Sequence, residues 1–362
     1  MSESNAATES DANRNAPIYL GIDLGGTSIK LALVREEKIV ALEQVLTKDF
    51  LGPREVFEFA LSFAKRQIET LGYQFDQLQA AGLAAPGVLA PDVDELREVA
   101  NLSAWTNVSL TDVATRILEK PVVLLNDANA AALAEYKARD LDGRSLALVT
   151  LGTGIGCGLL LNGVPHCGDS GIGGELGHVV IDAADHAWLC GCGKRGHVEA
   201  YAGAGGVVRI AKEMLRDNPG SVLHQDIDDL SPYLIAQAAE QGDATAVEIV
   251  CQTARYVGHA VSILCHIADP SYVLFGGAMD FGGPESTVGL RFLDVVRQTV
   301  VKQSLVQVGE HLHIEFATLG KDAGVIGAAL FAEQARETSS EAWDAASSSL
   351  LKNTTSFAEQ GT

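Results

Sequence analysis

Apolar runs separated by a glycine turn open the chain and predict a β-meander. Residues 18–23 and 29–34 are apolar on either side of Gly25-Gly26-Thr27, and a third run follows at 38–44. Apolar positions three to four residues apart predict a helix over 54–71. The next predicted elements are short strands at 80–85 and 121–125 and an alanine-rich helix at 128–137.

The second half of the chain repeats this pattern. A strand is expected at 145–152, a glycine-rich turn at 152–158 and a returning strand at 157–161. The remaining predicted elements are helices at about 199–216, 243–267, 287–303 and 323–335 and strands at 272–275 and 313–317. The mixture predicts an α/β fold in which a related β-hairpin begins each half.

Length and composition narrow the picture. A chain of 362 residues is long for one hydrophobic core, so two domains are expected. Residues 1–16 and 338–362 are polar and predict a disordered leader and a disordered tail. The leader lacks a secretory pattern and no apolar run approaches the ~20 residues of a membrane span, which favours a cytoplasmic protein without a membrane partner. The formal net charge of −21 disfavours a nucleic-acid partner.

Two of the glycine turns carry phosphate-binding chemistry. Glycines at a strand turn let backbone N–H groups approach a phosphate, Thr27 adds a hydroxyl, and Asp23 is placed to organise Mg²⁺. The turn at Gly152-Thr153-Gly154 is a weak signal alone, but together with the first turn it could bind a triphosphate from the opposite side. An ordinary glycine-rich hairpin is the alternative for each of these segments.

Two strand ends carry further candidates. Gly276 and Gly277 would let an adenine ring or a ribose lie against the backbone, although a plain strand-to-helix turn fits them as well. Asp127 follows an apolar strand and could accept a proton from a sugar hydroxyl, while Asn126 holds a neighbouring hydroxyl. A helix N-cap is the alternative role for this pair, and both roles are compatible.

A cluster of cysteines and histidines predicts a zinc site. Cys190 and Cys192 precede His197 closely, and His178 lies twelve residues upstream of Cys190. Two thiolates and two imidazoles suit tetrahedral Zn²⁺ with no open position, so the site is expected to be structural. Such a knuckle would hold the flanking carboxylates Glu175 and Glu199 rigidly toward sugar hydroxyls, unless these are ordinary surface carboxylates.

Taken together, the motifs resemble the ROK family (repressors, open reading frames and sugar kinases) of the actin-like ATPase superfamily. The matching segments cover about residues 17–336 in family order: DLGGTSIK at 23–30, APG at 85–87, NDANAAALAE at 126–135, LGTGIGCGL at 151–159, GGELGH at 173–178, CGCGKRGHVE at 190–199, LFGGA at 274–278 and LGKDAGVIGAA at 319–329.

This resemblance implies two actin-like, ribonuclease H-like domains with ATP and Mg²⁺ in the cleft between them. Residues 17–127, joined by the last helix at 323–336, would form the N-terminal domain, and residues 128–322, with the zinc knuckle, the C-terminal one. A homodimer or homotetramer is also implied.

The resemblance also implies roles for individual residues. Asp127 matches the catalytic base, and His197 stands where the family usually has a third cysteine ligand. The sugar contacts match Gly87, Asn126, Glu175, His178 and Glu199, the zinc ligands match His178, Cys190 and Cys192, and Lys30 belongs to the first ATP-binding segment.

The expected function is therefore ATP-dependent phosphorylation of a hexose, with glucose as the first choice of substrate. N-acetylglucosamine, N-acetylmannosamine, mannose and fructose are the alternatives within the family, and polyphosphate is a less favoured donor than ATP. A sugar-responsive transcriptional repressor is the alternative of another class. It is disfavoured because only about 16 polar residues precede the first predicted strand and because the chain is acidic.

Overall fold

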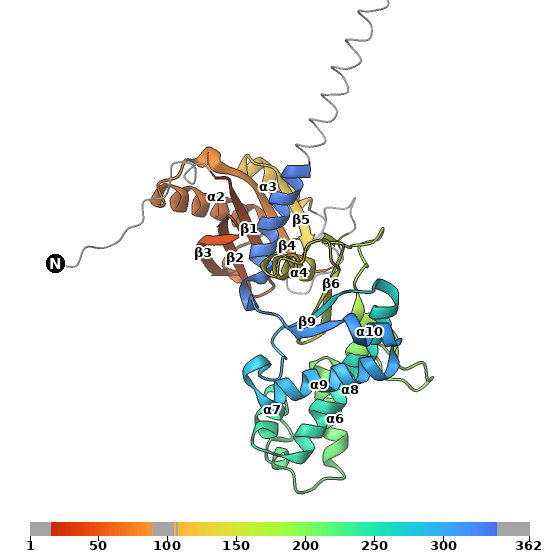
Figure 1. The fold of residues 1–362 in the computed structure, drawn as a ribbon. Coiled ribbons are helices and arrows are strands. Elements are labelled where there is room, and N and C mark those ends of the chain that lie inside the picture. The colour runs from red at the N-terminus through yellow and green to blue at the C-terminus, as the bar shows by residue number, and fades with distance from the viewer. Residues whose placement is uncertain (1–15, 88, 90–104, 106–107, 339–362) are drawn as a thin grey trace, which may run out of the picture. The chain divides into compact units, whose positions relative to one another are not determined.

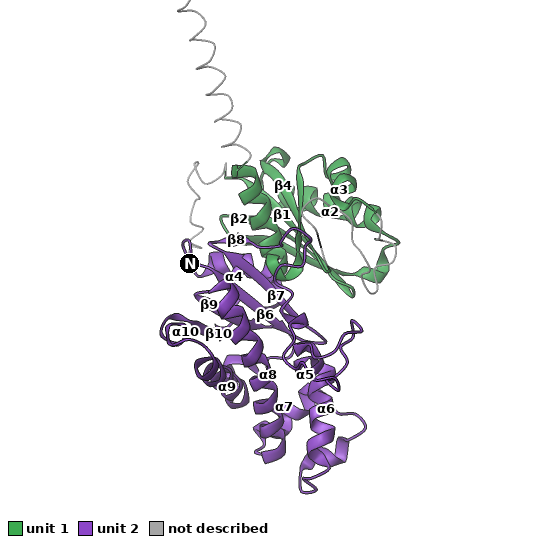
Figure 2. Ribbon diagram, turned by 90° about the vertical axis from the view of Figure 1, so that its right-hand side faces the viewer, with its two compact units in different colours: residues 1–130, 324–362 green, residues 131–323 purple. Residues whose placement is uncertain are grey.

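The computed structural model describes residues 16–87, 89, 105 and 108–338, so all but the last residue of the predicted leader and all but the first residue of the predicted tail lie outside the described residues. The chain divides into two compact units (Figure 2). Unit 1 comprises residues 1–130 and 324–362, and unit 2 comprises residues 131–323.

Unit 1 is built on a five-stranded sheet with the order β3-β2-β1-β4-β5 (Figure 1). Strands β1 and β2 pair antiparallel, as do β2 and β3, while β4 runs parallel to both β1 and β5. The predicted meander is therefore present. The strands are β1 (Ile18–Leu24), β2 (Ser28–Arg35), β3 (Lys38–Leu46), β4 (Leu78–Ala85) and β5 (Val122–Asn126).

Helices cover both faces of this sheet. The helices α2 (Pro53–Thr70) and α3 (Leu110–Leu118) bury apolar side chains against one face, and residues 323–338 form a helix over the other. This last helix lies so close to the sheet that a Cβ on Gly82 would come within 1.8 Å of the Ala328 carbonyl oxygen. Glycine in the middle of β4 is thus required by packing, at the position where a strand would otherwise favour a larger residue.

Unit 2 repeats the same sheet topology with the order β10-β9-β6-β7-β8. Strands β6 and β7 form the antiparallel hairpin, and β9 runs parallel to β6 and β10. The equivalence of the two sheets confirms the predicted α/β fold with a hairpin beginning each half. The strands are β6 (Leu146–Leu151), β7 (Ile155–Leu161), β8 (Val164–Pro165), β9 (Tyr272–Gly276) and β10 (His313–Phe316).

The helices of unit 2 pack around α8 (Ala244–Ala268), whose buried residues form much of the unit 2 core. One helix predicted over 199–216 is two, α5 (Val198–Ala202) and α6 (Ala204–Leu215), because the chain turns at Gly203 and the Ala204 N–H donates to the Gly152 carbonyl at 3.0 Å. The others are α4 (Asp127–Ala138), which begins in unit 1, α7 (Pro232–Glu240), α9 (Thr287–Gln303) and α10 (Val306–His311).

Short 3₁₀ helices join several of these elements. They span Thr47–Asp49, Phe75–Gln77, Leu176–His178, Val222–Asp226, Gly283–Glu285 and Gly320–Asp322.

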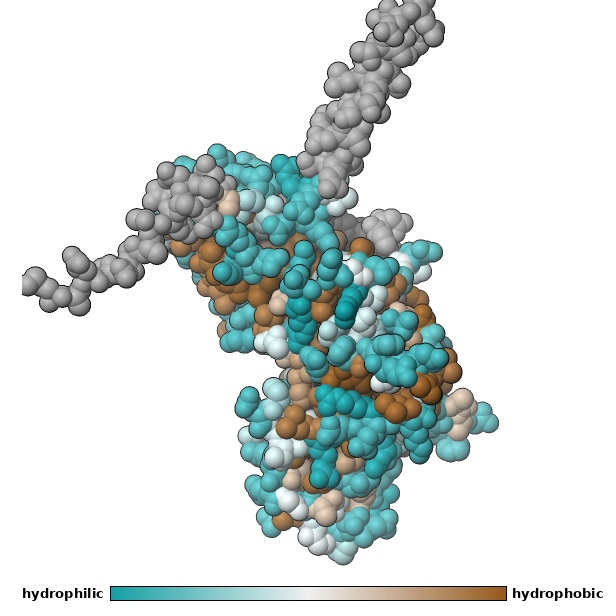
Figure 3. Space-filling model, viewed as in Figure 1, coloured by the Kyte–Doolittle hydropathy of each residue, from teal (hydrophilic) through white to brown (hydrophobic). Residues whose placement is uncertain are grey.

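Polar side chains dominate the surface drawn in Figure 3, interrupted by smaller apolar patches. The exposed apolar residues of unit 2 include Ile267 on α8 and Leu305 and Val306 at the start of α10. Within the described residues, no helix combines the length and the apolar character that crossing a membrane requires. The homodimer or homotetramer stays a prediction.

Candidate active site

The first glycine turn joins β1 to β2 in unit 1 and is held from the side by Thr47. The Thr47 hydroxyl donates to the Gly25 carbonyl at 2.6 Å, and the Thr47 N–H donates to the Thr27 carbonyl at 3.0 Å. Gly26 and Thr27 are exposed at the tip. Because the Gly25 and Thr27 carbonyl oxygens are bonded to Thr47, N–H groups at the tip can face an anion.

Asp23 and Lys30 are cross-strand partners at the base of this turn. The two residues pair in the β1–β2 register, with Asp23 half-buried and Lys30 buried. The Asp23 carboxylate lies against Gly324, since a Cβ added there would be 2.8 Å from Oδ2. Gly324 is in the first turn of the last helix, where backbone N–H groups and the helix dipole favour a negative charge. The fold therefore holds a carboxylate beside the first turn.

The Asn126–Asp127 pair ends β5 and begins α4. The side-chain oxygen of Asn126 accepts from the N–H groups of Ala128 and Asn129 at 2.9 and 3.2 Å, which is the N-cap role. Its amide nitrogen donates to the Gly87 carbonyl at 3.0 Å. Asn126 thus caps α4 and binds the backbone at Gly87, just after β4. Asp127 is half-buried, and its Oδ1 accepts from the Ala128 N–H at 2.8 Å.

These unit 1 residues share one edge of the sheet. In the parallel registers Asp23 is opposite Ala84, and Ala85 is opposite Asn126. Asp23 and Asn126 therefore lie two strands apart at the carboxyl ends of β1 and β5, which corresponds to about 10 Å between their backbones. The structure brings the predicted phosphate turn and the predicted base to the same edge of the sheet.

The second glycine turn joins β6 to β7 in unit 2 and contacts Glu199. The Gly152 N–H donates to the Gly154 carbonyl at 3.0 Å, which closes the turn around Thr153. The Ile155 N–H that follows donates to Glu199 Oε2 at 3.0 Å. Glu199 is in α5, so this carboxylate links the turn to the segment that carries the cysteines and histidines.

All four predicted zinc ligands lie together in unit 2. The ligand atoms of His178, Cys190, Cys192 and His197 are within 4.8 Å of one another. The two Nδ1 atoms are 3.3 Å apart, Cys192 Sγ is 3.3 Å from His197 Nδ1, and Cys190 Sγ is 4.0 Å from His178 Nδ1. A tetrahedral zinc ion bound by two nitrogens and two sulfurs needs ligand atoms about 3.3–3.8 Å apart. The donor set fits zinc, and the two separations of 3.3 Å match this spacing.

The protonation of this cluster also suits a cation. Burial lowers the pKa of His197, with the neighbouring His178 adding to the effect, so its imidazole is neutral at pH 7 and can donate a lone pair. Burial is the main cause that raises the pKa of Cys190 to about 11. Without a positive charge Cys190 remains a thiol, so a bound divalent cation would be needed to make it a thiolate ligand.

The segment that carries the cluster is anchored through Trp188. The Trp188 ring stacks on Tyr201 with ring centroids 4.6 Å apart, and the Trp188 N–H donates to the Tyr201 hydroxyl at 2.9 Å. The Tyr201 hydroxyl in turn donates to Asp182 Oδ2 at 2.6 Å. Burial, together with this bond, raises the pKa of Tyr201 to about 12, so the phenol remains a hydrogen-bond donor.

Both predicted sugar-contacting carboxylates of unit 2 flank the cluster. Glu175 Oε2 is 3.9 Å from His178 Nε2, and Glu199 Oε1 is 3.5 Å from Cys190 Sγ. Glu175 precedes the 3₁₀ turn that contains His178. The cluster therefore fixes Glu175 and Glu199 relative to each other and, through Glu199, relative to the second glycine turn.

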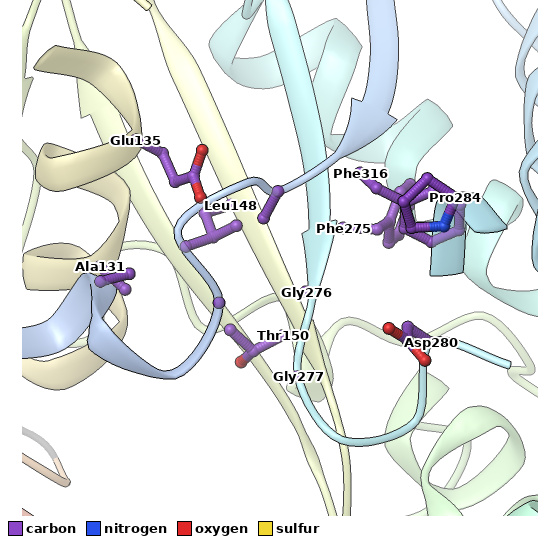
Figure 4. A pocket seen from close by; sticks show the side chains of 13 residues that line it. Ala131, Glu135, Leu148, Thr150, Phe275, Gly276, Gly277, Asp280, Pro284 and Phe316 are labelled. Carbon is purple, nitrogen blue, oxygen red and sulfur yellow. The ribbon is translucent and has the colours of Figure 1, made fainter. Parts of the chain in front are cut away.

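A pocket of about 130 Å³ lies at the end of β9, where the sequence predicted an adenosine site at Gly276 and Gly277. Its other lining residues are Ala131, Glu135, Leu148, Thr150, Phe275, Asp280, Pro284, Phe316, Ala317, Gly320 and Ala323. Figure 4 shows two carboxylates in this lining, Glu135 and Asp280, on opposite sides of the β9 end. Thr150 pairs with Gly276 in the sheet register, so the pocket lies beside the second glycine turn.

Sequence reasoning gave no role to Glu135 or Asp280. Glu135 is fully buried, and its carboxylate accepts from the Thr318 and Leu319 N–H groups, each at 2.7 Å. A charged residue within an alanine-rich helix was the available signal for Glu135, since burial of such a residue demands partners. Asp280 stands in a loop, where a lone acidic residue gives no signal.

Comparison with known proteins gives one consistent family. A protein-family model described as the ROK family matches residues 19–335. A glucokinase from Halalkalibacterium halodurans is 32% identical over 87% of this chain and 95% of its own length. The ROK hexokinase from Thermus thermophilus superposes with a TM-score of 0.73 at 30% identity, over 89% of this chain and 99% of that one. A ROK glucokinase from Streptomyces griseus, solved with glucose and AMPPNP, gives 0.65 at 30% identity over 88% and 99%.

Other relatives carry different names. An N-acetylmannosamine kinase from Haemophilus influenzae is 28% identical over 86% of this chain and 93% of its own length. A xylose repressor from Caldicellulosiruptor bescii is 24% identical over 87% of this chain and 78% of its own length. Similarity alone therefore leaves more than one activity open.

Proposed function

The chain belongs to the ROK family, and we propose that it is an ATP-dependent hexose kinase that converts glucose and ATP to glucose 6-phosphate and ADP. The predicted family and the actin-like, ribonuclease H-like fold class are both confirmed by the family match and the structural neighbours. The activity itself, the substrate and the roles of single residues are the substance of the proposal.

The observation that carries it is the position of Asp127. A half-buried carboxylate follows a helix-capping asparagine at the same sheet edge as a phosphate-type glycine turn. A capped helix start keeps Asp127 fixed in position, and a positioned carboxylate is what phosphoryl transfer to an alcohol requires as proton acceptor.

In this proposal the triphosphate is held by backbone N–H groups of the turns at Gly25–Thr27 and Gly152–Gly154. Asp23 would help to hold Mg²⁺, which would neutralise phosphate charge, and Lys30 belongs to the same segment. Backbone donors and a metal suit a chain whose net charge is −21, because such a surface offers no broad positive field. The adenosine occupies the pocket beside Gly276 and Gly277.

The sugar is held by Asn126 and Gly87 of unit 1 and by Glu175, His178 and Glu199 of unit 2. Asp127 accepts the proton of the 6-hydroxyl while the oxygen of that hydroxyl forms a bond to the γ-phosphorus. The bond from this phosphorus to the β–γ bridging oxygen breaks, leaving ADP. His178, Cys190, Cys192 and His197 would hold a structural zinc ion, which fixes the loop that carries the sugar contacts. None of these steps depends on the zinc ion.

Glucose is the proposed substrate because the relatives named glucokinase include one at 32% identity, whereas the N-acetylmannosamine kinase has 28%. The test is a coupled assay of ADP release by the purified protein with ATP and Mg²⁺. Glucose, mannose, fructose, N-acetylglucosamine and N-acetylmannosamine would each be supplied as acceptor. The proposal expects the highest kcat/KM with glucose. A higher kcat/KM with an N-acetylhexosamine would identify that sugar, and not glucose, as the substrate. If none of the sugars stimulates ADP release, the kinase assignment is wrong.

A further inference from the structure

Asp280 places a second carboxylate in the pocket beside the second glycine turn. It comes from the loop between β9 and α9 and lines the same pocket as Gly276, Gly277 and Pro284 (Figure 4). None of the roles in the proposed reaction uses this side chain.

The loop holds Asp280 in one position. The Gly282 N–H donates to Asp280 Oδ1, and the Gly283 N–H donates to the Asp280 carbonyl, each at 3.0 Å. Phe281, which follows, has a left-handed φ of 54° and is nonetheless buried, with its ring centroid 5.2 Å from that of Phe292. A bulky residue takes this conformation only where surrounding structure enforces it, so the loop is fixed by packing.

Asp280 also lies next to the turn that we assign to the phosphates. The Met279 N–H donates to the Leu151 carbonyl at 3.0 Å, so the residue before Asp280 is bonded to the residue before Gly152. Gly277 has a φ of 98°, and a Cβ there would lie 2.2 Å from the same carbonyl oxygen. The part of a nucleotide that is bonded directly to its phosphates is the ribose, so the ribose is the group this carboxylate would meet.

The chemistry of a carboxylate limits which groups of a nucleotide Asp280 can bind. An ionised carboxylate only accepts hydrogen bonds, and beside a triphosphate it repels the ligand unless a donor compensates. The 2′- and 3′-hydroxyls of a ribose supply two donors, and an acidic residue at the ribose is a recurring solution in nucleotide sites. We propose that Asp280 accepts a hydrogen bond from a ribose hydroxyl of ATP and so makes the protein select ribonucleotides. This proposal rests on the proposed kinase function.

The test compares Asp280→Asn with the wild-type protein. Asparagine keeps an oxygen for the Gly282 N–H and replaces the other acceptor by an NH₂ group, so the loop should persist. The measurement is kcat/KM with ATP, 2′-deoxy-ATP and 3′-deoxy-ATP at saturating sugar. For the wild-type protein we expect kcat/KM with at least one deoxynucleotide to be lower than with ATP by a factor of about ten or more, because a hydrogen bond to a charged group is lost. In Asp280→Asn the ratio should fall toward one.

Glu285→Gln is the matched control, since Glu285 is an exposed carboxylate of the same loop that does not line the pocket. It should leave the ratio unchanged. Equal use of ATP and both deoxynucleotides by the wild-type protein, or full discrimination retained in Asp280→Asn, would overturn the role of Asp280.

Calorimetric titration of the three nucleotides without sugar compares their dissociation constants for the wild-type protein and for Asp280→Asn. Discrimination in that titration would support the role of Asp280 even if no sugar of the panel is phosphorylated. The kinase assignment and the ribose contact can therefore fail independently.

Discussion

Replacing Glu135 by alanine should destabilise unit 2 more than any surface substitution. The carboxylate is fully buried and holds the loop after β10 to α4 through the Thr318 N–H, the Leu319 N–H and the Thr318 hydroxyl. The fourth partner is Arg139, whose side chain is only 14% exposed and which also donates to the Phe316 carbonyl at 3.0 Å. One side chain thus satisfies three donors from a segment more than 180 residues away in sequence and a nearly buried cation.

The loss of stability in Glu135→Ala can be estimated from the groups that lose their partner. Two backbone N–H groups lose their acceptor, at about 1–3 kcal/mol each where no water replaces it. Arg139 loses its counter-charge, and breaking a buried ion pair costs about 3–5 kcal/mol. The terms overlap, and Glu135 borders the pocket, where water can reach the freed donors. A loss of about 3 kcal/mol in the free energy of unfolding is expected.

Glu135→Gln keeps the hydrogen bonds to the backbone and removes the charge. Glutamine keeps a side-chain oxygen for the N–H groups of Thr318 and Leu319, but its NH₂ group replaces Oε2, the oxygen that accepts from Arg139 and from the Thr318 hydroxyl. We expect about 1–2 kcal/mol of destabilisation, clearly less than for alanine. The affinity for ATP should also fall in Glu135→Ala, because the freed loop forms one wall of the pocket.

The assay is equilibrium unfolding in urea at pH 7, followed by tryptophan fluorescence and circular dichroism and fitted with separate transitions for the two units. Trp188 lies in unit 2 and reports the relevant transition. Glu213→Ala is the control, since Glu213 forms an exposed pair with Arg209 and should cost at most about 0.5 kcal/mol. A loss below about 1 kcal/mol for Glu135→Ala would show that this carboxylate does not hold the loop after β10 to α4.

Two further outcomes follow from the structure. The purified protein should contain about one zinc ion per chain by elemental analysis, lose it in His197→Ala and retain it in His197→Cys; a folded wild-type chain without bound metal would contradict the assigned ligand set. The Ser286 hydroxyl, followed by the Val288 N–H, lowers the pKa of Glu240 from its ordinary 4.5, so its contribution to stability is complete above about pH 4.5 and disappears as the pH falls through the lowered value. In Glu240→Gln the unfolding midpoint should therefore depend less on pH below about pH 4.5. An unchanged pH dependence would show that this carboxylate does not contribute to the loss of stability in acid.

Most strands of both sheets could be predicted because they are short, largely apolar runs, and glycine or proline lies next to several of them. The two-residue strand β8 was not predicted. The break between α5 and α6 could not, since the apolar spacing continues through Gly203 and only the hydrogen bond from Ala204 to the Gly152 turn ends the first helix. That contact joins segments about fifty residues apart, which a local pattern does not contain.

The candidate site divides in the same way. Cys190, Cys192 and His197 lie close in sequence, so their spacing already predicted a cluster, and His178 joins them through a short ladder in which Val180 pairs with His197. The partners of Glu135 could not be predicted, because they follow β10 and are far along the chain. Local motifs thus indicate ligand sets, while the residues that support them are fixed by long-range contacts.

The role of Asp127 as proton acceptor can be measured through the sugar-dependent turnover of Asp127→Asn. Asparagine keeps a side-chain oxygen for the Ala128 N–H, so the start of α4 should be unaffected. We expect a sugar dissociation constant close to that of the wild-type protein and a kcat about 10²–10⁴-fold lower, the range supplied by a positioned base. A kcat close to that of the wild-type protein would contradict the assignment of Asp127 as the proton acceptor.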